Sequence, residues 1–153
     1  MRRTLQYAAM TKDEVQHSKW TFYEAVKNGR GAMKGQGVRR NILGFMYAER
    51  LKSALIIAGQ LLDVLPDLNE DERSGGLKMF GSFVKGVGNE MRLAANVMGG
   101  SDWDGLSGQL NLLEGYARLG QLEAARQELS QTLSRVTTLG SSTMTSLKRA
   151  GLL

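Results

Sequence analysis

Apolar side chains recur at helical spacing along most of this chain, and two long stretches of that pattern flank its single proline, Pro66. From about Val38 to Leu65 they form a wide apolar stripe with the period of an α-helix. From about Glu70 to Met98 they alternate spacings of three and four residues, as in a helix that packs along another helix. Proline ends a helix because it lacks a backbone donor and clashes with the preceding turn. The pattern therefore predicts a hairpin of two long helices with Pro66 at its tip.

Residues with capping chemistry predict where the helices begin and end. Thr11 and Glu14 have capping-box spacing, which predicts a first helix that runs to about Lys27. Either Asp67 or Asn69 can cap the helix over 70–98, and Asn69 is followed three residues later by Glu72. The same helix is predicted to end at the glycine pair 99–100.

The last third of the chain predicts two more helices. Residues 101–104, Ser-Asp-Trp-Asp, have the composition of a helix cap and precede a periodic stretch that Gly120 interrupts. A final helix is expected from about Gln121, with a break at Gly140 left open. Because no stretch alternates convincingly with period two, we predict an all-α fold, a compact antiparallel bundle of four or five helices in a single domain over 1–153.

One segment resembles a known helical repeat. Four positions within residues 109–133 carry the residue types of a tetratricopeptide repeat: Tyr116, Gly120, Ala125 and Leu129. Thr132 stands where that repeat usually has alanine, no proline follows, and the repeat's period of about 34 residues does not recur elsewhere in the chain. The resemblance implies a tight helix pair with its turn at Gly120, and no peptide-binding site is carried over from the family.

The positive charge of the chain is concentrated in one segment. The sequence has 20 basic and 15 acidic residues, and between Ala25 and Ala48 it has five bases and no acid. Residues 28–37 contain four glycines, each of which costs a helix about 1 kcal/mol relative to alanine, so we expect a flexible connector there. The candidate contacts for an anionic partner or nucleic acid are Lys27, Arg30, Lys34, Arg39 and Arg40. The alternative is a solvated loop, since lysine and arginine normally occupy surfaces.

A second candidate surface lies on the helix over 70–98. Small residues repeat there every seven positions, which would let a neighbouring helix approach closely, and methionines share the apolar stripe. The candidate residues for a helix–helix or partner interface are Gly81, Gly88, Ala95, Met91 and Met98. Such a stripe is also what the core of an ordinary bundle contains.

No motif in the chain assembles catalytic or metal chemistry. Cysteine is absent, and His17 is the only histidine, so a two-histidine metal site or a serine triad from one subunit is excluded. Residues 67–78 lack the glycine and the final glutamate of a calcium-binding loop, and the glycine-rich segment 28–37 fits no phosphate-binding fingerprint. We therefore expect no catalytic, cofactor or metal site.

These observations favour a non-enzymatic helical interaction module, such as an assembly subunit, adaptor or chaperone, that acts through a helix groove or by self-association. The alternative is a nucleic-acid-binding bundle that grips backbone phosphates through the basic connector 27–40. Partners would then be a protein, a second copy of the chain, or nucleic acid. Because no signal peptide or membrane-spanning stretch is evident, we expect a cytoplasmic protein.

Overall fold

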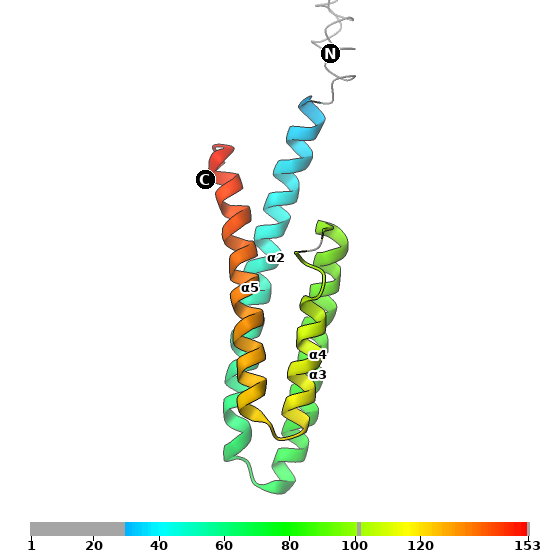
Figure 1. Ribbon diagram of the computed structural model, residues 1–153, viewed down its shortest axis with the longest axis vertical. Coiled ribbons are helices and arrows are strands. Elements are labelled where there is room, and N and C mark those ends of the chain that lie inside the picture. Colours follow the sequence, from blue (N-terminus) through cyan, green and yellow to red (C-terminus); the bar gives the residue numbers. More distant parts are fainter. Residues whose placement is uncertain (1–29, 101, 153) are drawn as a thin grey trace, which may run out of the picture. The chain divides into compact units, whose positions relative to one another are not determined.

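The computed structural model describes residues 30–100 and 102–152, with side chains from Gly35 onward, and these residues form an all-α fold (Figure 1). The elements are α2 (Arg30–Val64), the short 3₁₀ helix η2 (Leu65–Asp67), α3 (Glu70–Met98), α4 (Leu106–Arg118) and α5 (Leu122–Arg149). The predicted helix over 11–27 lies outside the described residues. The chain divides into the units Met1–Arg39 and Arg40–Leu153, and the second contains the helical bundle.

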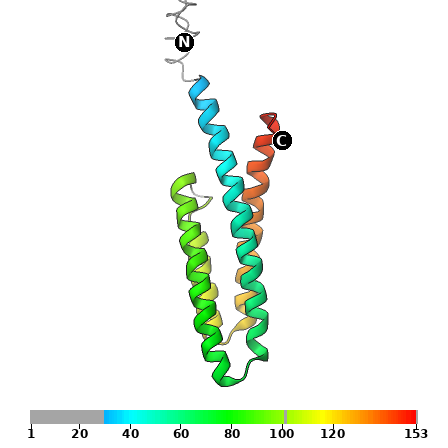
Figure 2. The same cartoon turned by 180° about the vertical axis from the view of Figure 1, so that it is seen from behind.

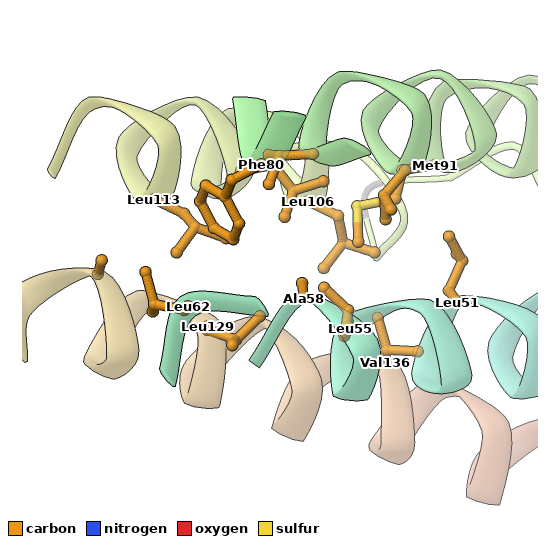
Figure 3. Packing of buried hydrophobic residues seen from close by; sticks show 14 of the residues in the cluster. Leu51, Leu55, Ala58, Leu62, Phe80, Met91, Leu106, Leu113, Leu129 and Val136 are labelled. Carbon is orange, nitrogen blue, oxygen red and sulfur yellow. The ribbon is translucent and has the colours of Figure 1, made fainter. Parts of the chain in front are cut away.

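Two antiparallel hairpins build the bundle of the unit Arg40–Leu153. Figure 1 shows α4 and α5 in front, and Figure 2, seen from behind, shows α2 and α3 in front. The inner faces of both hairpins meet in one apolar core, to which all four helices contribute (Figure 3). Among its most deeply buried side chains are Leu51, Leu55, Leu62, Phe80, Met91, Leu106, Leu113 and Val136. The predicted all-α bundle is thus confirmed, with four helices in this unit.

The connector at Pro66 forms the predicted hairpin tip. Pro66 stands in the first turn of η2, where its missing backbone donor is not needed. Asn69 then caps α3: its side-chain oxygen accepts from the Glu72 amide at 3.0 Å, and the Glu72 carboxylate accepts from the Asn69 amide at 3.3 Å. Arg73 donates to the carbonyls of Pro66 and Leu68, which ties the connector back onto α3.

Two predicted boundaries are wrong. The connector expected over 28–37 is helical from Arg30 onward, because no proline or capping residue stops α2 there and an established helix gains one hydrogen bond for each residue added. The cap predicted at residues 101–104 includes Ser101, which lies outside the described residues, and the N-cap of α4 is instead Gly105, which is left-handed with φ 81° and has no side chain to cap the helix. Trp103 is instead buried in the core.

Glycines let α2 lie close to its neighbours. A Cβ on Gly44 would lie 2.6 Å from Met98 Cε and 2.8 Å from Thr143 Cγ2. On α5, a Cβ on Gly140 would lie 3.1 Å from the Cβ of Ala48. The last helix, α5, is continuous through Gly140. This glycine is therefore a point of close contact with α2 and not a break in the helix.

Candidate interaction surface

The small residues predicted to form an interface on α3 pack against other parts of this chain. Gly81 and Gly88 are buried against α4, where a Cβ would lie 3.0 Å from Glu114 Oε1 and 3.8 Å from Leu110 Cδ1, respectively. Ala95 is half-buried against the core. These residues lie at a helix–helix contact of the chain itself, so a partner could reach the two glycines only by displacing α4.

The two methionines assigned to the same surface belong to the core. Met91 and Met98 are 1% and 5% exposed, and the Met91 side chain lies in the apolar core (Figure 3). Methionine fills irregular gaps in cores because its side chain is unbranched and flexible. Neither residue presents an adaptable binding groove in this arrangement.

The structure describes the side chains of only two of the five basic residues that were predicted to contact an anionic partner. Lys27 lies outside the described residues, while Arg30 and Lys34 are on α2 with side chains that are not described. Arg39 is exposed. Arg40 is also exposed, and its Nη2 donates to the carbonyl of Gly99 at 2.8 Å, at the carboxyl end of α3. That bond places one cation at a helix terminus where it satisfies an unpaired carbonyl.

The surface that stands out in the structure is the outer face of α2. Six aliphatic side chains there are between 40% and 61% exposed: Ile42, Met46, Ile56, Ile57, Leu61 and Val64. The helix also supplies buried side chains to the core from its opposite face, so α2 is apolar on two sides. We call these six residues the α2 outer face. They form two groups, Ile42 with Met46 and the four residues from Ile56 to Val64, and the exposed Arg50 and Ser53 lie between the groups. Exposed apolar side chains on one helix face mark interaction sites more often than single scattered ones do.

A groove adjoins the α2 outer face on the side toward α3. It has a volume of about 340 Å³ and is lined by Arg50, Leu51 and Ala54 of α2 and by Phe83, Val87 and Glu90 of α3. An ion pair crosses it, with Arg50 Nη2 at 3.0 Å from Glu90 Oε1. A smaller hollow of about 200 Å³, lined by Leu43, Met46, Tyr47 and Arg50, continues along α2. The two hollows share Arg50. The lining of the groove is apolar apart from Arg50 and Glu90, the two charged residues of the ion pair.

A second groove, between α3 and α4, is more polar. Its volume is about 280 Å³, and it opens beside Gly88, where α3 has no side chain. Lys85, Asn89 and Arg92 line it from α3, and Asn111 and Glu114 line it from α4. Glu114 forms an ion pair with Arg118, one turn further along α4, with Glu114 Oε1 at 3.0 Å from Arg118 Nη2. Within the described part of the chain, no group of three acidic or histidine side chains is placed to hold a metal ion.

The apolar stripe predicted from about Val38 to Leu65 lies on α2, and only part of it is buried. Ile42, Met46 and Leu61 have the spacing of that stripe, and all three are exposed. Apolar residues occur around much of the circumference of α2, so periodicity alone does not separate its two faces. The relevant clue was the excess itself, because a helix at the surface of a bundle needs only one apolar stripe.

No protein-family model matches this chain, and comparisons with curated proteins and with solved structures find no match either. Among the helices that the structure describes, none is both long and apolar enough to cross a membrane.

Proposed function

We propose that this protein is a non-enzymatic helical interaction module that binds another helix through the α2 outer face and the groove beside it. The observation that supports this is the exposure of six aliphatic side chains on a helix whose opposite face already fills the core. A partner helix with apolar residues at spacings of three and four would bury this face, as helix-in-groove recognition does. An assembly subunit, an adaptor or a chaperone would use such a surface.

Two properties of this surface support the proposal. Burying a half-exposed isoleucine or leucine gains on the order of 1 kcal/mol from the hydrophobic effect alone. The Arg50–Glu90 pair at the groove rim is exposed, so it contributes little to the stability of the fold and is available to orient a partner. The proposal therefore assigns affinity to the aliphatic residues and orientation to the charged rim.

The test compares two matched variants of the full chain in pull-downs from lysate of the source organism and in sedimentation. Ile57→Glu places a carboxylate in the middle of the α2 outer face. Leu112→Glu makes the same change at a residue of similar exposure on α4, at 53% against 46%. We expect Ile57→Glu to abolish association and Leu112→Glu to leave it intact. A strictly monomeric wild-type protein that recovers no partner would contradict the proposal.

The charge distribution favours one alternative, a bundle that binds nucleic acid through Lys27, Arg30, Lys34, Arg39 and Arg40. These five cations account for the whole positive excess of the chain. If all five contact phosphates, counterion release gives a salt slope near about −4.5, or binding roughly 500-fold weaker at about 200 mM than at about 50 mM salt.

Replacing the five cations with glutamine and measuring DNA and RNA binding at those two salt concentrations tests this alternative. We expect loss of most of the affinity and a nearly flat salt dependence if the segment is the site. If the glutamine variant bound DNA and RNA with unchanged affinity, the basic segment would not be the binding site. A first indication is the ratio of absorbance at 260 and 280 nm, before and after high salt, of protein purified without nuclease.

A further inference from the structure

We propose that the groove between α3 and α4 binds a small organic anion, with a phosphate or carboxylate head group and a short apolar part. The groove is lined by none of the residues of the α2 outer face, so this site goes beyond the proposed interaction function. Its volume of about 280 Å³ is slightly less than the roughly 300–1,000 Å³ of most small-molecule sites. The size of the groove therefore fits a small ligand better than a partner helix.

Three polar side chains of α3 line the groove with hydrogen-bond donors. Lys85, Asn89 and Arg92 are separated by four and three residues, so they lie on one face of the helix. Arg92 Nη2 donates to the side-chain oxygen of Asn89, which leaves the N–H groups of that amide to act as donors. The ammonium group of Lys85 and the guanidinium group of Arg92 are donors only. The α3 side of the groove is therefore suited to an oxyanion.

The charges that line the groove also favour an anion. Lys85 and Arg92 are exposed, and neither forms an ion pair with another residue that the structure describes. Glu114 is the one acidic residue of the lining. Its carboxylate is already paired with Arg118, and its side chain is only 13% exposed. The two cations of α3 therefore remain to bind a ligand, and charge complementarity selects an oxyanion.

Gly88 leaves space in the groove for the apolar part of the ligand, beside the buried side chains of Val84 and Leu110. Glycine in the middle of a helix is unfavourable, so each one calls for a reason. At Gly81 the reason is the approach of α4, since a Cβ there would lie 3.0 Å from Glu114 Oε1. At Gly88 a Cβ would lie 3.8 Å from Leu110 Cδ1, which is an ordinary van der Waals distance. Packing does not require a glycine at 88, and the open groove accounts for it.

Titration of the full chain with phenyl phosphate, followed by the NMR shifts of backbone amides, tests the charged part of the site. Because both cations are exposed, we expect a dissociation constant on the order of 1 mM at low salt, with the largest shifts in residues 85–92 and 110–114. Arg92→Gln and Lys85→Gln should each weaken binding about threefold, and together about tenfold. Lys78→Gln is the matched control, because Lys78 is exposed on α3 and does not line the groove. It should bind as tightly as the wild type.

Further probes separate the head group from the apolar part. Benzoate should bind at the same residues as phenyl phosphate, inorganic phosphate should bind at least about threefold more weakly, and neutral benzyl alcohol should shift no amide of the groove. Gly88→Ala places a methyl group in the groove and should weaken phenyl phosphate binding about threefold, while inorganic phosphate binding stays unchanged. Gly86→Ala makes the same change where a Cβ meets nothing within 4 Å and should alter neither affinity.

Three results would overturn this proposal. The first is the absence of amide shifts at about 20 mM phenyl phosphate, which is some 20 times the expected dissociation constant. The second is an equal loss of affinity in Lys78→Gln and Arg92→Gln, which would indicate general attraction to the positive charge of α3. The third is a set of shifts centred outside the groove. Glutamine has nearly the helix propensity of lysine and arginine, so weaker binding by these variants reports the lost charge and not a lost helix.

Discussion

α2 and α5 lie side by side in the bundle (Figures 1 and 2), and they differ in what they present to water. The outward residues of α2 include six half-exposed aliphatic side chains, whereas no large hydrophobic side chain of α5 (Leu122–Arg149) is exposed. The outer side of α5 carries threonines and serines such as Thr137, Thr138 and Thr145. Both helices fill the same core, so the difference between them is confined to their outer faces.

The outer face of α5 is polar because it carries hydroxyl groups. Thr137, Thr138 and Thr145 each donate to the carbonyl one turn back, at 2.8 to 3.0 Å, and their remaining lone pairs are open to water. Such residues stabilise a helix poorly, since β-branched side chains have a lower helix propensity than alanine or leucine. Their use on α5 favours solubility over helix strength. On α2 the exposed positions have the opposite character, which is why we propose that face as the interaction surface.

Adjacent residues of α2 give the largest expected contrast. Leu55→Ala removes a side chain that is 1% exposed and should lower the free energy of unfolding by about 2–5 kcal/mol, because it leaves a cavity in the core. Ile56→Ala, at a residue 47% exposed, should lower it by less than about 1 kcal/mol. Urea unfolding at low micromolar concentration measures both. Similar losses would mean that the two sides of α2 are not different in burial.

The contact of α2 with α3 and α5 at Gly44 gives the next largest effect. Gly44→Ala should destabilise the fold by about 1–2 kcal/mol, because strain against Met98 and Thr143 outweighs the gain in helix propensity. Gly86→Ala is the matched control in the middle of α3, where a Cβ meets nothing within 4 Å. It should stabilise the fold by about 0.5–1 kcal/mol. A gain in thermal midpoint for both variants would show that α2 can move away from its neighbours.

Helix ends could be predicted from the sequence where the chemistry is local. The Asn69–Glu72 capping box and the glycines at 99 and 120 act within a few residues, and each marks a boundary in the structure. The start of α2 could not be predicted in this way, because glycine content lowers helix propensity without excluding helix. Trp103 was missed for a related reason. It is buried from a turn, where no periodic pattern exists to show it.

The candidate surface depends on which helix faces are covered by neighbouring helices, and this was harder to predict than the helix ends. The glycines at 81 and 88 had the spacing of a close helix contact, but only the fold shows that α4 fills it. Conversely, Ile42 and Met46 have the spacing of the apolar stripe from about Val38 to Leu65, and both are exposed. Periodicity reports how many apolar residues a helix has on each side, and the neighbours decide which side is covered.

The exposed link between α2 and α5 should have a smaller effect than the buried contacts. Arg126 of α5 donates to Asp63 of α2 at 3.0 Å and to Glu123 at 3.3 Å, and these hydrogen bonds raise the pKa of the guanidinium. Arg126→Gln should lower the thermal midpoint slightly, and the difference should shrink at about 1 M salt, where exposed charges are screened. Arg135→Gln, which loses a bond to the neutral Gln109, is the control. Its effect should not depend on salt.

The smallest effect on stability should come from exchanging the outer-face residues themselves. Ile57→Thr on α2 and Thr138→Ile on α5 should each change the free energy of unfolding by less than about 0.5 kcal/mol, because both positions are exposed. Their effects on solubility should be opposite, since the first removes apolar surface and the second adds it. Precipitation by ammonium sulfate measures this at constant fold stability. A lower solubility of Ile57→Thr would mean that its exposed side chain is not what makes α2 differ from α5.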